Sequence, residues 1–169
     1  QLYYDANAQL AEVVDPGSMV ADFGYTQVGS AYLLSSIRNA TANQWLAFHG
    51  VTPSVPDPTT TTISYNTTST DPRFGWATGV TLPAPDGTTT ADQPYKTYTY
   101  GTLATATSNG LSYMDEGGVT GVEADGHTRT VTFDPSMQEL TDESAGGLTT
   151  TNTWDPNGTD ELLATLNPD

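Results

Sequence analysis

Residues 129–133 read Arg-Thr-Val-Thr-Phe, and residues 96–100 read Lys-Thr-Tyr-Thr-Tyr. In both stretches threonines alternate with larger or apolar side chains. Alternate side chains of a β-strand point to opposite faces, so this period of two predicts strands with one half-buried face. Thr, Val and Tyr also suit the pleated surface of a sheet. The two stretches therefore predict a mainly β protein.

Further strand candidates flank these two stretches, and turn-forming residue pairs separate many of them. Short strands between turn signals are typical of antiparallel sandwiches. We predict an antiparallel β-sandwich or jelly roll with two or three short peripheral helices, in a single β-rich domain over residues 1–169. No repeat of fixed period is evident. The candidate strands are 19–28, 60–68, 73–82, 95–107, 111–114, 127–133 and 148–154, and the turns are Asp71-Pro72, Asp86-Gly87, Asn109-Gly110, Asp125-Gly126 and Gly146-Gly147.

Three segments have the spacing of short helices. Residues 5–14 begin with Asp5 as a capping residue, and residues 1–15 are thus expected to form an N-terminal helical arm. Residues 31–40 carry apolar side chains at helical intervals, and residues 159–167 predict a short C-terminal helix. Residues 45–49 fit a helix or a buried strand, and the nearby Gly50 favours the strand.

The charge balance is strongly acidic. Four basic residues face fourteen Asp and six Glu, which gives a formal net charge of −16. Such a charge repels itself in dilute salt, whereas molar salt shortens the Debye length to about 3 Å. We interpret the composition as adaptation to high salt; an ordinary acidic secreted protein is the alternative. Four cations cannot form the basic surface that nucleic acid or an anionic membrane requires, so neither is an expected partner.

The location can be predicted only in outline. No stretch approaches the roughly 20 apolar residues of a membrane-spanning helix, so no membrane insertion is expected. The sequence begins with Gln1 rather than Met. Either a leader was removed, which would place the protein outside the cell, or the sequence omits an earlier segment.

Signatures of catalysis are missing from the sequence. It contains no phosphate-binding glycine loop with a lysine, no paired-histidine zinc motif and no nucleophile elbow. His49 and His127 each lie beside a glycine at the end of a predicted strand, as turn or core histidines do. The glutamates do not form the pair beside strand aromatics that a small glycosidase needs. We therefore expect no enzymatic activity and no catalytic residues.

Two acidic loops are the candidate cation sites. Asp115, Glu116, Glu123 and Asp125 border a glycine-containing loop, and Asp155 and Asn157 begin a stretch with an oxygen-bearing side chain at every second residue. Calcium prefers six to eight oxygen ligands, which makes it the cation to consider. The alternative is that both are solvated turns, and no other cofactor is expected.

The tryptophans allow two interpretations. Trp45, Trp76 and Trp154 could form a platform on which sugar rings stack, as in carbohydrate-binding sandwiches. Tryptophans at strand positions also serve as core or interface anchors.

Length, composition and strand pattern resemble those of the small structural proteins of viruses that infect halophilic archaea, especially their single jelly-roll capsid proteins. A local resemblance to β-rich phage tail and neck proteins covers residues 33–38, 45–50 and 52–62. The resemblance implies many copies packed in a shell. We therefore expect a virion protein, as a capsid subunit or a turret, spike or tail component, that assembles with itself and other structural proteins.

The alternative is a surface or filament subunit, or a carbohydrate-binding β-sandwich module, of a halophilic microbe. Its location would be extracellular or on the cell surface.

Overall fold

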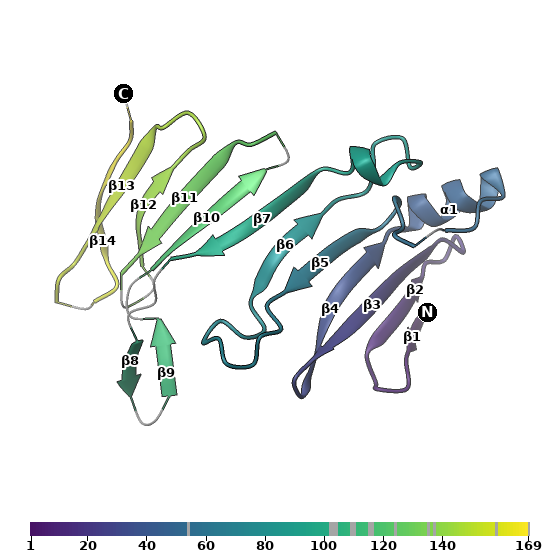
Figure 1. Ribbon diagram of the computed structural model, residues 1–169, viewed down its shortest axis with the longest axis horizontal. Helices are drawn as coiled ribbons and strands as arrows, with labels where there is room; N and C mark the ends of the chain where they lie inside the picture. Colours follow the sequence, from purple (N-terminus) through teal and green to yellow (C-terminus); the bar gives the residue numbers. More distant parts are fainter. Residues whose placement is uncertain are drawn as a thin grey trace. The chain divides into compact units, whose positions relative to one another are not determined.

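The computed structural model describes residues 1–53, 55–101, 105–108, 111–114, 117–123, 125–134, 136, 138–157 and 159–168, and only the backbone of those between 105 and 119. The chain divides into two compact units, Gln1–Tyr95 and Lys96–Asp169, here called the N-terminal and C-terminal units. Both consist mainly of antiparallel strands (Figure 1), so the predicted β class is confirmed. The division does not test the single-domain prediction, which stays a prediction.

In the N-terminal unit six strands follow one another in chain order, each antiparallel to the one before. The longest pairing joins β3 and β4, from Asp22 opposite Arg38 to Val28 opposite Ala31. The strands are β1 (Leu2–Tyr4), β2 (Leu10–Val14), β3 (Val20–Val28), β4 (Ala31–Arg38), β5 (Thr61–Tyr65) and β6 (Ala77–Thr81).

The C-terminal unit repeats this hairpin-by-hairpin pattern. Strand β7 pairs with β10, and β11 to β14 follow in order. A separate two-stranded hairpin, β8 with β9, lies between β7 and β10 in the sequence. The strands are β7 (Tyr95–Tyr100), β8 (Thr105–Ser108), β9 (Leu111–Met114), β10 (Gly117–Glu123), β11 (Thr128–Phe133), β12 (Glu139–Glu143), β13 (Thr149–Trp154) and β14 (Leu162–Leu166).

One α-helix, α1 (Ala40–His49), follows β4, and a single 3₁₀ turn, η1 (Thr90–Asp92), precedes β7. The Asn39 side chain caps α1 by accepting a hydrogen bond from Ala42 N at 2.8 Å. Gly50 ends the helix in the left-handed conformation, with φ 62°, which glycine adopts without a steric cost. The strand favoured for residues 45–49 is therefore wrong, because the two caps and the intervening alanines stabilise a helix.

Helix α1 lies against β3 (Figure 1). Asn43 Nδ2 donates hydrogen bonds of 2.8 Å to Val20 O and to Asp22 Oδ2. Leu46 is only 6% exposed. One amide side chain and one leucine thus fix the helix on the sheet.

All three helices predicted from spacing are strands in the structure. Residues 10–14, in the expected N-terminal arm, form β2; residues 31–38 form β4; and residues 162–166, in the expected C-terminal helix, form β14. Asp5 does hydrogen-bond to backbone N–H groups, but it closes a hairpin loop rather than capping a helix. Both roles use the same local bonds, so an Asp at a segment boundary does not distinguish them.

The predicted sandwich or jelly roll is not confirmed. A jelly roll needs Greek-key connections between distant strands. Apart from the β8–β9 hairpin, the strands within each unit pair with their neighbours in chain order.

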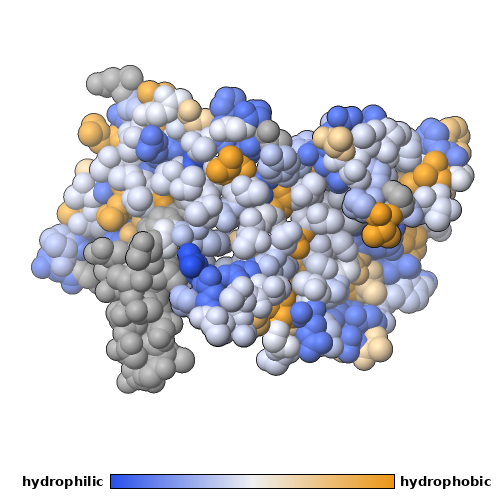
Figure 2. Space-filling model, viewed as in Figure 1, coloured by the Kyte–Doolittle hydropathy of each residue, from blue (hydrophilic) through white to orange (hydrophobic). Residues whose placement is uncertain are grey.

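The described residues contain few buried side chains. The buried apolar ones are Val28, Leu46 and Ala84, and no large side chain is completely enclosed. Figure 2 shows apolar residues scattered over the viewed face among hydrophilic ones. Each sheet therefore leaves much of its apolar area open to solvent.

Candidate functional site

Aspartates at the ends of strands organise the hairpin loops. Asp5 N donates to Gln9 O at 2.8 Å, and the Asp5 carboxylate accepts from the N–H groups two and four residues later. Asp134 makes the same three bonds around residues 134–138. Asp15 and Asp155 close their loops with part of this pattern. In the sequence, an aromatic residue followed by Asp marks three of these four loops. The pairs do not recur at a fixed period, so they are not evident as a repeat.

At least eight of the fourteen aspartates accept such a bond from a backbone N–H. Asp and Asn are frequent in turns for this reason. Part of the acidity of this chain thus has a local structural role in addition to its effect on the surface charge.

The first candidate cation loop brings Glu123 and Asp125 together with His127. Ligand atoms of the three side chains lie within 4.8 Å of one another, and all three residues are exposed. Asp125 Oδ2 lies 2.7 Å from His127 Nδ1. Lys96 Nζ lies 2.7 Å from Glu123 Oε1 and occupies one of the oxygens that a cation would need. Asp115 and Glu116 are candidates too, but lie outside the described residues.

Hydrogen bonds in this loop shift the pKa values of Asp125 and Lys96. The backbone N–H of His127 donates to Asp125 Oδ1 at 3.0 Å and is the main cause that lowers the pKa of Asp125. The hydrogen bond with Glu123 raises the pKa of Lys96. The arrangement is that of a polar hairpin in which Lys96 pairs with Glu123 and His127 contacts Asp125. The sequence did not single out His127 as a ligand candidate.

In the second loop the Asp155 carboxylate already has three partners. Its Oδ1 accepts from the backbone and side-chain nitrogens of Asn157 at 3.0 and 2.8 Å, and its Oδ2 accepts from Thr159 Oγ1 at 2.6 Å. The Thr159 bond is the largest cause of the lowered pKa of Asp155. The polar spacing noticed in the sequence is therefore the spacing of a closed turn.

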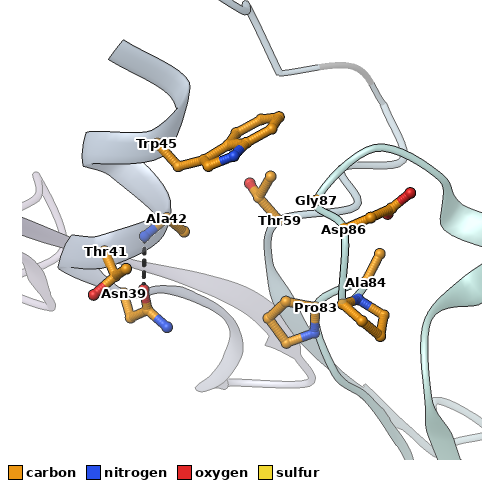
Figure 3. Close-up of a pocket in the computed structure, with 10 residues that line it drawn as sticks. Asn39, Thr41, Ala42, Trp45, Thr59, Pro83, Ala84, Asp86 and Gly87 are labelled. Atoms are coloured by element: carbon orange, nitrogen blue, oxygen red, sulfur yellow. Dashed lines mark hydrogen bonds between the residues drawn. The ribbon is translucent and has the colours of Figure 1, made fainter. Parts of the chain in front are cut away.

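The three tryptophans differ in their surroundings. Trp154 Nε1 donates to Glu139 O at 2.8 Å, which anchors its ring on the neighbouring strand. The backbone of Trp76 bonds to Asn66 and Arg73 in a turn. Trp45 projects from α1 and lines a pocket of about 330 Å³ (Figure 3).

The pocket lies between the first turns of α1 and the loop after β6. Thr59, which is 4% exposed, lies between these two walls (Figure 3). The loop is tied to the segment beneath it by a 2.7 Å hydrogen bond from Ala84 N to Pro58 O. The lining residues are Asn39, Thr41, Ala42, Trp45, Thr59, Pro83, Ala84, Pro85, Asp86 and Gly87.

A network of charged and hydroxyl side chains holds the segment that carries Thr59, one of the residues that line the pocket. Asp57 accepts hydrogen bonds from the hydroxyl groups of Thr59 and Thr60 at 2.7 and 2.8 Å, and it pairs with Arg38. Arg38 also reaches Asp22 at 3.4 Å. Burial by itself would raise the pKa of Asp57, but the hydrogen bonds from Arg38 and the threonines lower it to about 2. The segment that carries Thr59 is thus held to the end of β4.

Each of the four basic side chains of the chain pairs with a carboxylate. Arg73 lies 2.8 Å from Asp71, and Arg129 lies 2.5 Å from Asp142; Arg38 and Lys96 have the partners given above. Most carboxylates therefore have no cationic partner to neutralise them.

His49 has a structural environment. Its Nδ1 lies 2.8 Å from Trp45 O, and its ring lies 4.3 Å from the Trp45 ring, centroid to centroid. These contacts keep both rings on the last turns of α1. The expectation of no catalysis stays a prediction.

None of the helices in the described part of the chain has the length and apolar character needed to cross a membrane. In comparisons with known proteins, no family model matches the sequence, and no curated protein matches it significantly.

Proposed function

We propose that this protein is a non-catalytic structural protein that assembles with further copies of itself through the edges of its sheets. The composition favours a setting in high salt, and the resemblance to viral structural proteins suggests a virion or another extracellular assembly. The exposed edge strand β14 is the observation that carries the proposal.

Strand β14 has the sequence Leu-Leu-Ala-Thr-Leu and, among the strands that the structure describes, pairs with β13 alone. Leu162, Leu163 and Leu166 are 47%, 55% and 71% exposed. Natural sheets usually protect an edge with lysine, proline, a bulge or a very short strand, because its free N–H and C=O groups pair readily with another strand. Strand β14 has neither lysine nor proline, and its one register shift lies at its beginning. It therefore suits pairing with a strand of a second copy.

The N-terminal edge strand, β1, also exposes apolar side chains. Leu2, Tyr3 and Tyr4 are 58%, 47% and 61% exposed. With only three residues, β1 offers a shorter edge than β14.

The scarcity of buried side chains supports association as well. Apolar area removed from water contributes roughly 25 cal/mol per Å², so covering these sheets with a second copy would be favourable. The sandwich or jelly roll that the sequence predicts within one chain stays a prediction.

The net charge of −16 sets the conditions for such contacts. Like-charged copies repel at low ionic strength, whereas molar salt screens the repulsion and leaves apolar and hydrogen-bonded contacts effective. We therefore expect the assembly to strengthen as KCl increases.

The test is sedimentation velocity in increasing KCl, with the double variant Leu163→Lys/Leu166→Lys. We expect the parent to form dimers or larger species and the variant to stay monomeric. The matched control is Leu148→Lys, which changes a 53% exposed leucine in the β12–β13 loop and should still assemble. A parent that stays monomeric at every salt concentration, or a variant that assembles like the parent, would contradict the proposal.

A further inference from the structure

We propose that the pocket beside Trp45 binds one ring of a neutral carbohydrate. This inference is separate from assembly through sheet edges, because the pocket is formed by α1 and the 83–87 loop rather than by an edge strand.

The size and lining of the pocket suit a small polar ligand with an apolar face. Its volume of about 330 Å³ is at the lower end of the range of about 300–1,000 Å³ that is common for small-molecule sites. Trp45 and the prolines Pro83 and Pro85 supply apolar surface. A pyranose ring has one face of C–H groups that stacks on such an aromatic surface.

The Trp45 ring is held in place before any ligand binds. His49 packs against it but does not line the pocket, so the pocket contacts another side of the indole. Gly87 has φ +70°, which residues with a side chain rarely adopt, and a Cβ at this position would be in ordinary van der Waals contact with the indole, at 3.6 Å. The Gly87 backbone therefore lies close to the ring, and a larger residue at position 87 would be strained by its backbone conformation. Figure 3 shows the indole reaching from α1 toward the opposite loop.

Three hydrogen-bond donors around the pocket have no protein partner among the residues that the structure describes. Asn39 Oδ1 caps the helix, but no hydrogen bond within the described part of the chain uses Asn39 Nδ2, Thr41 Oγ1 or Trp45 Nε1. Across the pocket, Asp86 accepts from Thr88 N at 2.9 Å and from Thr88 Oγ1 at 2.5 Å, and these bonds lower the pKa of Asp86. Its ionised carboxylate has further acceptor capacity. The free donors match sugar hydroxyl oxygens, which accept hydrogen bonds, whereas the Asp86 carboxylate is turned toward its own loop.

The charges around the pocket favour a neutral ligand. No lysine or arginine lines it, and Asp86 repels an anion. A cation could interact with Trp45 and Asp86, but it would leave the three donors without an acceptor. A polyol offers acceptor oxygens to these donors without bringing a charge into the pocket.

The test follows the three indole N–H signals of the ¹⁵N-labelled protein in high salt. The signals are assigned with Trp→Phe variants at positions 45, 76 and 154. The probes are the methyl pyranosides of glucose, galactose, mannose and N-acetylglucosamine. We expect at least one to shift the Trp45 signal alone, in a saturable manner.

Two variants measure the contribution of the site. Trp45→Ala lacks the indole signal, so its binding is followed through the backbone amide signals of Gly87 and Thr88; the substitution should weaken binding about tenfold or more, through loss of stacking. Thr41→Val, an exposed change that leaves the fold intact, should weaken it by a smaller factor, and Trp76→Phe is the matched control that should bind normally. Absence of any saturable Trp45 shift, or equal binding by the Trp45→Ala and parent proteins, would overturn the inference. Sedimentation of the same samples reports on assembly independently.

Discussion

Val28, Leu46 and Ala84 are 4%, 6% and 6% exposed, and all three belong to the N-terminal unit. In the C-terminal unit, no apolar side chain that the structure describes is buried to this extent, and cross-strand polar pairs are prominent instead. Thr120 and Thr130 hydroxyl groups lie 3.2 Å apart, those of Thr132 and Thr141 lie 2.5 Å apart, and Arg129 pairs with Asp142.

The difference follows from the elements that each unit contains. The N-terminal unit has α1, which lies against β3. The C-terminal unit consists of hairpins, whose exposed faces must be stabilised by neighbouring strands alone. Packing should therefore dominate the energetics of the first unit, and pairwise cross-strand contacts those of the second.

The largest expected effect is that of Leu46→Ala. Removing a buried leucine costs about 2–5 kcal/mol, through lost burial and the cavity left behind. Urea denaturation followed by circular dichroism measures the change. Phe48→Ala on the same helix is the control, because Phe48 is 87% exposed and its loss should matter little. Equal effects of the two variants would mean that α1 is not packed as described.

Asp57→Asn should cost about 2–3 kcal/mol at neutral pH, because Arg38 loses the less exposed of its two carboxylate partners and keeps only Asp22. The pKa of Asp57 is about 2 in the folded protein, against 3.8 unperturbed. A lowered folded pKa contributes stability that is present above the unfolded pKa and lost as pH falls through the folded one. Unfolding free energies should thus converge between the parent and the variant from about pH 4 to pH 2. Parallel pH profiles would contradict this role.

Asp134→Ala tests the loops that both units share. The variant loses two hydrogen bonds to backbone N–H groups, which should cost about 1 kcal/mol. Asp134→Asn keeps an acceptor oxygen and should stay close to the parent in the same denaturation experiment. If Asp134→Asn lost as much unfolding free energy as Asp134→Ala, the effect would come from the charge of Asp134 and not from its hydrogen bonds in the turn.

Asp142→Asn should have the smallest effect, about 0.5 kcal/mol or less, because its partner Arg129 is 59% exposed. The loss of unfolding free energy is measured for Asp142→Asn and Asp57→Asn at low and high KCl. High salt should reduce the effect at the exposed pair in the C-terminal unit more than at the less exposed pair in the N-terminal unit. A loss as large as that of Asp57→Asn would show that exposed pairs carry the C-terminal unit.

Local sequence patterns predicted the structure correctly in two cases: strands whose side chains alternate in polarity, and turns marked by residue pairs such as Asp-Gly. The alternating stretches 96–100 and 129–133 form parts of β7 and β11, as predicted, and the pair Asp125-Gly126 lies between β10 and β11. Glu123 and Asp125, two of the four residues proposed for the first cation loop, lie close together in this hairpin, and the cation itself stays a prediction. The pocket could not be predicted, because its two walls come from segments far apart in the sequence.

The sequence by itself determined the β class, the acidic charge and the positions of many turns, because these depend on side-chain alternation, composition and bonds between residues a few positions apart. Only the tertiary structure decided that residues 31–38 and 162–166 are strands, and that residues 40–49 are a helix. A short apolar segment fits either conformation, and the choice depends on whether a neighbouring strand is available for its backbone hydrogen bonds. The position of Trp45 opposite Asp86 has the same origin, since it required α1 and the 83–87 loop to meet.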